Sequence, residues 1–275
     1  MFSGLKTAKS RVGLFGFQAR NKIAEWWGTL PRPEARRAQT FTELMNLSQA
    51  SPRDCYAAAL HEYRRAPGPI RAHRRYFIGT GRGFGEDAFH GAWWLLWQER
   101  LPERAIEIGV FRGQTISLWT LAAQLCSRPC AVHGISPLEP VGDSVSEYPA
   151  DIDYESDILD SFKRFRLPAP TLVRALSTDP GAIDHIAAGT WDLAYVDGNH
   201  DYDVAKSDLK RAWAALRPGG ILVADDAALF LDAVPFKGAF MGHNGPSRAV
   251  VECEREGMHR LGTVGHMVFF EKPAT

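Results

Sequence analysis

From residue 104 onward, short apolar runs alternate with amphipathic stretches of helical period. Runs of four to six apolar residues suit strands that are buried on both faces of a sheet. Strands that alternate with helices predict a parallel sheet with helices on both faces, which is a doubly wound α/β fold. The five parallel strands are expected at Ala105–Ile108, Ala131–Ile135, Thr171–Leu176, Trp191–Val196 and Gly220–Ala224.

Two further apolar runs lie near the end of the chain, at His259–Val264 and Met267–Glu271. Because only two residues separate them, we expect them to pair as an antiparallel hairpin. The segment before them, residues 247–257, has a helical pattern. The pattern as a whole predicts one mostly parallel sheet of seven strands whose last strand runs antiparallel.

The region before the sheet, residues 40–103, is predicted to be helical. Helical spacing of apolar residues marks residues 40–66 and again residues 86–99, which carry three tryptophans. Between these helices lie a linker signal at residues 67–69 and a glycine-rich stretch at residues 79–85, either a flexible loop beside a site or a plain connector. We expect a helical N-terminal extension that acts as a lid or as a dimer contact.

Residues 1–39 form a basic and aromatic arm. Eight Lys and Arg residues stand against Glu25 and Glu34, and apolar residues that include Trp26 and Trp27 lie between them. Three interpretations remain open for this arm. It is a helix that packs on the body or on a second subunit, an interfacial helix on anionic lipid, or a transit peptide.

Composition narrows the class of protein. A chain of 275 residues with 45% hydrophobic residues supports one sizeable core. The 32 basic residues balance 32 acidic ones, which disfavours a nucleic-acid-binding protein. No apolar run is long enough to span a membrane. Four cysteines without a repeated C-x-x-C pair argue against a zinc cage and fit a reducing compartment such as the cytoplasm.

The most informative motif runs from Glu107 to Gly113, where the first predicted strand meets a helix. Glycine at position 109 permits a tight turn and the close approach of a ligand, while Gly113 opens the helix N-terminus. The G-x-x-x-G spacing differs from the G-x-G-x-x-G of dinucleotide-binding folds. A carboxylate at Glu107 repels a pyrophosphate and suits a cationic or amino-bearing ligand. The motif therefore favours S-adenosylmethionine over NAD.

Three motifs in chain order carry a resemblance to a known family. They are E-I-G-x-x-x-G from residue 107, W-D-L-A-Y-V-D-G-N-H-D-Y from residue 191 and L-R-P-G-G-I-L-V-A-D-D from residue 216. Together they resemble the class I S-adenosylmethionine-dependent methyltransferases, most closely the small-molecule O-methyltransferases of the macrocin and catechol type. The resemblance covers Arg104–Glu271. It implies a Rossmann-like fold and a methyltransferase domain over residues 104–275.

The resemblance also implies positions for the cofactor. Glu107, Gly109 and Gly113 match the residues around the methionine part, and Ser177 matches the adenine-side position after the third strand. At the end of the second strand the family expects an acidic residue for the ribose, and this chain has Ser136 there. A hydroxyl hydrogen-bonds a ribose more weakly than a carboxylate does. Glu139, three residues later, is a second candidate for that contact.

Three aspartates lie at the ends of predicted neighbouring strands: Asp197 after one, and Asp225 and Asp226 after the next. The carboxyl ends of parallel strands share one sheet edge, so these carboxylates would repel one another unless a cation held them. The matching positions of metal-dependent O-methyltransferases bind magnesium, so the resemblance implies Mg²⁺ or another divalent cation. Asp197 is expected beside the cofactor as well. Strand alternation turns Asp226 away unless the strand end bends.

Transfer of a methyl group to a hydroxyl also needs a group that removes the proton. His200 follows Asp197 by three residues, where the catechol enzymes place their basic residue, and we take His200 and Asp197 as the catalytic candidates. The alternative is that His200 merely lies beside a helix cap. His243 and His266 are further candidates. Residues 230–245 are expected to form a substrate lid.

The sequence thus predicts a methyltransferase that uses S-adenosylmethionine and a divalent cation to methylate a hydroxyl of a small metabolite, a sugar or a natural product. Two alternatives are a different chemistry on the same fold and a non-catalytic, methyltransferase-like binding or assembly protein. The expected partners are a small-molecule acceptor and a second copy of the chain. The expected compartment is the cytoplasm, with organelle targeting or membrane contact left open by residues 1–39.

Overall fold

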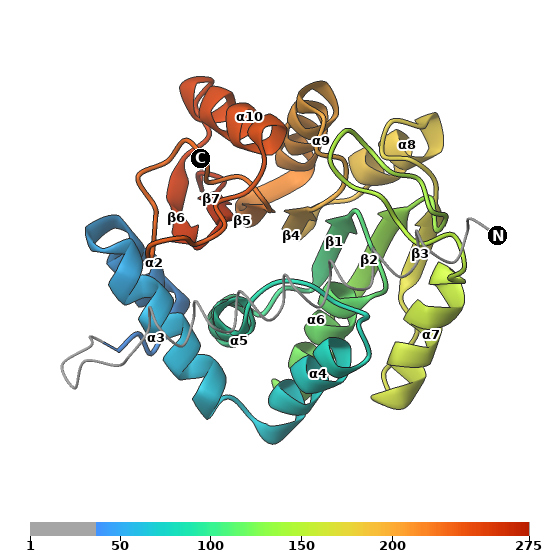
Figure 1. Cartoon of the computed structure of the whole chain (residues 1–275), viewed down its shortest axis with the longest axis horizontal. Helices are drawn as coiled ribbons and strands as arrows, with labels where there is room; N and C mark the ends of the chain where they lie inside the picture. Colours follow the sequence, from blue (N-terminus) through green and yellow to red (C-terminus); the bar gives the residue numbers. More distant parts are fainter. Residues whose placement is uncertain (1–36, 275) are drawn as a thin grey trace.

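Seven strands form one sheet in the order β3-β2-β1-β4-β5-β7-β6 (Figure 1). β7 pairs antiparallel with β5 and with β6, while the other pairs are parallel. The predicted Rossmann-like sheet with its antiparallel last strand is therefore confirmed. The computed structural model describes residues 37–274, so the arm predicted at residues 1–39 lies almost wholly outside the described residues. The strands are β1 (Arg104–Ile108), β2 (Ala131–Ser136), β3 (Thr171–Arg174), β4 (Trp191–Val196), β5 (Leu216–Ala224), β6 (Arg260–Val264) and β7 (Met267–Glu271).

Helices cover both faces of the sheet, as Figure 1 shows. Alternate residues of β1 point to opposite faces: Ala105 belongs to one hydrophobic cluster with α2, α3, α5, α6 and α7, and Ile106 to another with α8, α9 and α10. The helices are α2 (Phe41–Ala50), α3 (Pro52–Arg65), α4 (Gly68–Gly79), α5 (Asp87–Arg100), α6 (Gln114–Leu125), α7 (Tyr154–Arg164), α8 (Pro180–Ala188), α9 (Tyr202–Ala215) and α10 (Asn244–Arg255).

The N-terminal helices differ from the prediction in two places. The helix expected over residues 40–66 is divided at Ser51, whose extended backbone (φ −158°) ends α2 and whose hydroxyl caps α3. The segment interpreted as a linker at residues 67–69 is the start of α4, because proline is well tolerated in the first helical turn. α7 was not predicted either.

Two of the three tryptophans of α5, Trp93 and Trp97, are core residues, and Trp94 is partly buried. Trp93 packs edge-on against Trp119 and Tyr195, and Trp97 stacks on Trp119 with ring centroids 5.9 Å apart. α2 joins the same core, since Phe41 contacts Phe269 on β7. Trp93 and Trp97 are thus buried within one chain.

The structure also describes the cysteines and the lengths of the helices. All four cysteines are free thiols, and Cys55 and Cys253 are buried. None of the helices described between residues 37 and 274 is long and apolar enough to cross a membrane.

Candidate active site

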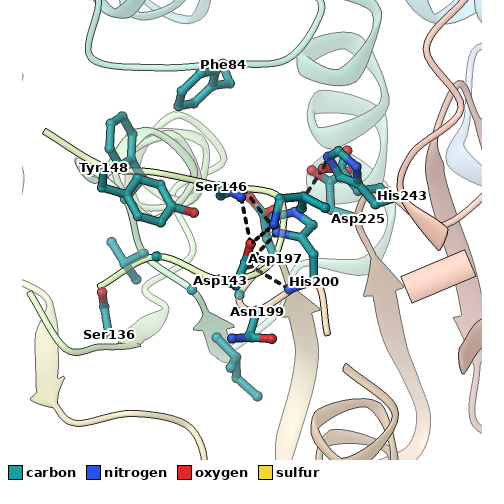
Figure 2. Close-up of a pocket in the computed structure, with 18 of the residues that line it drawn as sticks. Phe84, Ser136, Asp143, Ser146, Tyr148, Asp197, Asn199, His200, Asp225 and His243 are labelled. Atoms are coloured by element: carbon teal, nitrogen blue, oxygen red, sulfur yellow. Dashed lines mark hydrogen bonds and ion pairs between the residues drawn. The ribbon is translucent and has the colours of Figure 1, made fainter. Parts of the chain in front are cut away.

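A cleft of about 1090 Å³ opens at the carboxyl edge of the sheet, beside the ends of β1, β2, β4 and β5. Most of the residues singled out from the sequence line it, although they come from segments far apart in the chain. In Figure 2, Ser136 and Tyr148 lie on the side of this cleft away from Asp225 and His243. The predicted residues that line it are Gly109, Ser136, Glu139, Ser177, Asp197, His200, Asp225, Asp226, His243 and His266.

The turn between β1 and α6 explains both glycines of the first motif. Gly109 has φ 102°, and a Cβ there would lie 2.1 Å from the backbone oxygen of Asp197. Gly113 caps α6 with φ 83°, and a Cβ would meet Ile158 at 3.2 Å. L side chains rarely adopt such positive φ values. Gly109 is therefore required by the neighbouring strand end, not only by a ligand.

Glu107 is almost completely buried beneath this turn. Burial raises its pKa to about 8, against hydrogen bonds from the Thr115 side chain and the Ile116 backbone. Within residues 37–274, its Oε2 has no hydrogen-bond partner. Glu107 also borders a small side pocket that it shares with Gly109 and Asp197. A buried carboxyl oxygen without a partner is where an amino group or other cation can bind.

The candidates for binding the ribose and adenine, Ser136, Glu139 and Ser177, also line the cleft. Ser136 ends β2, and its hydroxyl is 3.4 Å from the backbone nitrogen of Leu138. Glu139 is exposed and faces Arg174, 3.8 Å away. Ser177 lines the cleft, and its hydroxyl helps to lower the pKa of Asp208 on α9. Burial raises the pKa of Asp208 to about 6, although Ser177 and Arg211 oppose that shift.

The end of β5 bends sharply, so two consecutive aspartates face the same space. Asp226 has φ 51°, a left-handed conformation that aspartate tolerates better than most residues. As a result, His266 Nε2 lies 3.5 Å from Asp225 Oδ1 and 3.5 Å from Asp226 Oδ1. Strand alternation would have turned Asp226 away, and the left-handed residue prevents it.

The sequence analysis expected a cation alone to balance the three aspartates. In the structure, His200 and His266 balance part of the charge of Asp226. Burial and the charges of Asp225 and Asp226 raise the pKa of Asp197 well above its usual range. Burial would raise the pKa of Asp226 too, but a hydrogen bond from His200 and the charge of His266 lower it. The interaction between Asp197 and Asp225 raises the pKa of Asp197 further and opposes the rise at Asp225.

Two groups of side chains in the described part of the chain bring ligand atoms within 4.8 Å of one another, and they share Asp226. Asp197 belongs to neither group, although it was grouped with Asp225 and Asp226 from the sequence. The first group is His200, Asp226 and His243; the second is Asp225, Asp226 and His266.

His200 is held between two carboxylates. Its Nδ1 lies 2.7 Å from Asp143 Oδ2 and its Nε2 lies 3.1 Å from Asp226 Oδ2. Burial alone would lower its pKa, but the hydrogen bonds and charges of Asp226 and Asp143 raise it to about 9. His200 thus holds a proton near neutral pH, and both of its ring nitrogens are occupied.

The loop between β2 and α7, residues 137–153, supplies site residues that the sequence analysis missed. Asp143 accepts a hydrogen bond from the His200 backbone at 2.9 Å, besides its contact with the ring. Figure 2 shows Asp143, Ser146 and His200 joined by dashed lines in the cleft. The local signal was the turn in which Asp143 Oδ1 accepts from the backbone of Val145 and Ser146. That signal identifies a turn but not its distant partner.

One wall of the cleft is aromatic. Phe111 lies between Phe84 and Tyr148, with ring centroids 5.1 and 5.6 Å away. Phe84 belongs to the glycine-rich stretch between α4 and α5, so that loop borders the site. The buried Arg74 guanidinium donates to the backbone oxygens of Phe84 and Gly85 and fixes the loop.

The segment predicted as a lid, residues 230–245, lies partly over the cleft. Phe240 and His243 line the cleft, and Phe240 contacts the His266 ring at 5.1 Å. Phe236 instead packs against Tyr56, and Met241 is buried. The lid's apolar residues are thus divided between the cleft and the core.

The comparisons with known proteins agree with this architecture. A family model described as a methyltransferase domain matches residues 106–227, from β1 to just beyond β5. Among curated proteins, no relative matches the chain.

Solved structures share the fold at low sequence identity. A putative O-methyltransferase from Klebsiella pneumoniae is 13% identical, with 76% of this chain and 91% of that chain covered and a TM-score of 0.52. An SAH-bound methyltransferase from Podospora anserina is 15% identical, covering 75% and 88%, with a TM-score of 0.50. An O-methyltransferase from Bacillus cereus in complex with SAH is 12% identical, covering 75% and 92%, also at 0.50.

Proposed function

We propose that this chain is a class I S-adenosylmethionine-dependent methyltransferase that transfers the methyl group to a hydroxyl of a small molecule with the help of a divalent cation. The observation that carries the proposal is the composition of one cleft. A carboxylate and histidine cluster lines it, and a small side pocket that shares Gly109, Asp197 and Asp225 with it is bordered by Glu107, whose Oε2 has no hydrogen-bond partner in residues 37–274.

The residues present fit S-adenosylmethionine. Glu107 Oε2 is a buried acceptor for the amino group, and the Gly109–Gly113 turn leaves backbone exposed to the cleft. Ser136 and Ser177 would contact the ribose and adenine parts, and Asp197 would lie beside the cofactor. When bound, this cofactor supplies an electrophilic methyl group on a positively charged sulfur.

The residues also fit a divalent cation. Asp225 and Asp226 converge, and Asp225 Oδ1 has no hydrogen-bond partner in residues 37–274. Asp197 lines the same cleft and is influenced by the charges of Asp225 and Asp226, although it lies outside both groups of converging ligand atoms. A cation held by Asp197, Asp225 and Asp226 would lower the pKa of a bound hydroxyl.

We assign a positioning role to His200, and proton removal to Asp197 in the cation-bound site, where the cation would balance the carboxylate charge in place of a proton. The ring nitrogens of His200 already face Asp143 and Asp226, so the ring has no position left for a substrate proton. Asp197 ends β4 inside the cleft and has no histidine partner among the described ion pairs. Asp197→Asn should therefore lower turnover by about 10²–10⁴-fold, and His200→Gln by less.

The acceptor is expected to carry an apolar portion. The cleft volume of about 1090 Å³ is at the upper end for a small-molecule site and leaves room for a cofactor and an acceptor. Phe84, Phe111 and Tyr148 form the apolar wall. A sugar or natural product with a hydrophobic face would suit it.

We also propose roles for the two regions of the chain, an oligomeric state and a compartment. Residues 104–275 act as the methyltransferase domain, and residues 40–103 border the cleft through Phe84 and Gly85, which supports a lid role over a dimer contact. A homo-oligomer remains a prediction. The free thiols support a reducing compartment such as the cytoplasm.

Calorimetric titration of the full chain with S-adenosylmethionine, followed by a methyl-transfer assay on a panel of hydroxylated compounds, tests the proposal. We expect cofactor binding, and transfer that falls in the presence of a chelator. Failure to bind the cofactor would contradict the assignment. Transfer to amines but not hydroxyls would contradict the acceptor class.

A further inference from the structure

His266 reaches the cleft from the turn between β6 and β7. This turn is distant along the chain from the three aspartates that were predicted as ligands. Its backbone oxygen accepts a hydrogen bond from Ala227, which holds this turn against the end of β5. The ring packs edge-on against Phe89 at 4.6 Å and against Phe240 at 5.1 Å. Only 4% of the side chain is exposed. The imidazole is therefore fixed in one orientation, toward the carboxylates.

The distances around His266 Nε2 suit a shared cation better than they suit hydrogen bonds. Nε2 lies 3.5 Å from one oxygen of Asp225 and 3.5 Å from one oxygen of Asp226. Hydrogen bonds between nitrogen and oxygen are usually about 2.7–3.2 Å long. Atoms that ligate one cation at about 2.1 Å lie roughly 3.0–3.4 Å from one another.

The neighbouring group around His200 is less suited to a metal. His200 Nε2 is within hydrogen-bonding distance of Asp226 Oδ2, at 3.1 Å, and Asp143 occupies its other nitrogen. By contrast, Asp225 Oδ1 has no hydrogen-bond partner in the part of the chain that the structure describes. The free acceptor thus points to the group with His266.

We propose that His266 is a ligand of the divalent cation, and that the mixed set of Asp225, Asp226 and His266 selects a first-row transition metal such as Mn²⁺ over Mg²⁺. This inference rests on the cation in the proposed function, and it narrows the expected metal. Magnesium prefers an all-oxygen shell and keeps its waters, whereas imidazole favours transition metals. At the three aspartates, the resemblance implied Mg²⁺ or another divalent cation, without a choice between Mg²⁺ and Mn²⁺.

Metal binding to the full chain, measured with Mn²⁺ by the loss of its free spin-resonance signal and with Mg²⁺ by calorimetry, tests the inference. We expect the unmodified protein to bind Mn²⁺ at least tenfold more tightly than Mg²⁺. His266→Gln should weaken Mn²⁺ binding about 10–100-fold and change Mg²⁺ binding by less than threefold. Equal affinity for the two metals, or no effect of His266→Gln on Mn²⁺, would overturn the inference.

Two further variants keep the test informative. His266→Asp replaces the imidazole by a third carboxylate and should remove the preference for Mn²⁺ while retaining Mg²⁺ binding. His243→Gln, in the neighbouring group, is the matched control and should change Mn²⁺ affinity by less than threefold. If His243→Gln weakens Mn²⁺ binding and His266→Gln does not, the cation lies in the other group and the inference is wrong. Binding of S-adenosylmethionine by each variant verifies that it is folded.

The same measurements separate this inference from the proposed function. Binding of S-adenosylmethionine and Mg²⁺ without a preference for Mn²⁺ would overturn the role of His266 and leave the proposed function intact. Binding of S-adenosylmethionine but of no divalent cation would overturn both the role of His266 and the metal assistance. Failure to bind S-adenosylmethionine, with Mn²⁺ still bound through His266, would overturn the methyl transfer alone.

Discussion

Two neighbouring loops border the cleft and meet where Phe111 contacts Tyr148, and they differ in how the sequence specifies them. The turn between β1 and α6 is short, and its two glycines are required by backbone geometry within a few residues and by one strand end. The loop between β2 and α7 is long, and its main anchor is Asp143, whose partner His200 lies 57 residues away. The glycines that the short turn requires are visible as a motif in the sequence. The pairing of Asp143 with His200 joins residues far apart in the chain and leaves no such motif.

The largest expected effect tests the crowded turn. Gly109→Ala would place a Cβ 2.1 Å from the Asp197 backbone oxygen at a φ of 102°. We expect the free energy of unfolding to fall by more than about 4 kcal/mol, measured by chemical denaturation.

Gly219→Ala is the matched control, because Gly219 also has a positive φ, 74°, but a Cβ there meets nothing within 4 Å. Its loss should be about 1–2 kcal/mol, the cost of the backbone conformation alone. Equal losses at the two positions would mean that crowding against Asp197 is unimportant.

The second largest expected effect is on cofactor affinity, and it concerns the carboxyl group of Glu107 beneath the same turn. Glu107→Gln should weaken S-adenosylmethionine binding by about 1.5–3 kcal/mol, which is roughly 10–150-fold, because a charge-assisted hydrogen bond is lost. Calorimetry at fixed pH gives the value, with thermal unfolding to verify the fold. An affinity unchanged within twofold would show that Glu107 does not contact the cofactor.

The pH dependence of cofactor binding sharpens that result. Burial raises the pKa of Glu107 to about 8, so below pH 8 a cationic ligand must displace a proton from the carboxyl group. Affinity should rise up to about tenfold per pH unit between pH 6 and 8 and level off above that. Glu107→Gln should lack this rise, and the variant also corrects for titration of the ligand itself. Parallel pH profiles in the two proteins would exclude Glu107 as the titrating group.

On the other loop, Asp143→Asn is expected to lower turnover about 10–100-fold, with cofactor affinity retained. The reason is that His200 loses a charged partner and the loop loses its anchor on the far side of the cleft. Asp151→Asn, in the same loop, should leave turnover nearly unchanged. Similar losses in both variants would point to a general disturbance of the loop.

The smallest effect is on stability, at Asp208. Its pKa in the folded state is raised by burial to about 6, above the unfolded value of 3.8. The protonated form is therefore favoured in the folded state, and this contribution is present below pH 3.8 and lost as pH rises through 6. Asp208→Asn should gain roughly 1 kcal/mol at pH 7.5, after the lost Arg211 contact is subtracted, and almost nothing at pH 4. A gain that does not vary with pH would refute this account.

The elements that could be predicted from the sequence are those with a strong apolar signal. The strands β1, β2, β4 and β5 are rich in apolar residues because both of their faces are covered. α7 was missed because its buried face consists mainly of Tyr154, Ile158 and Phe162 among charged residues. α4 was missed because its Gly-Pro start is typical of a linker as well as of a first helical turn.

In the site, the strand ends were predictable and the arrangement of charges was not. The end of a buried strand indicated Asp197, Asp225 and the sheet edge that they share. The left-handed conformation of Asp226 leaves no unambiguous mark in the sequence, because aspartate is also common in ordinary loops. His266 and Asp143 reach the same cleft only through tertiary packing, so neighbours along the chain do not reveal that His266 faces Asp226 or that Asp143 binds His200.

The contacts of Arg74 have a consequence for acceptor recognition. Its buried guanidinium binds Asp87 and the backbone of the loop that carries Phe84, while Gln114 donates to the Phe84 carbonyl as well. The loop is thus ordered before any ligand arrives, and an acceptor that packs against Phe84 does not have to supply the entropy of fixing it. Discrimination between acceptors at this wall should then follow their shape, with fast entry and little dependence of the binding entropy on the acceptor's size.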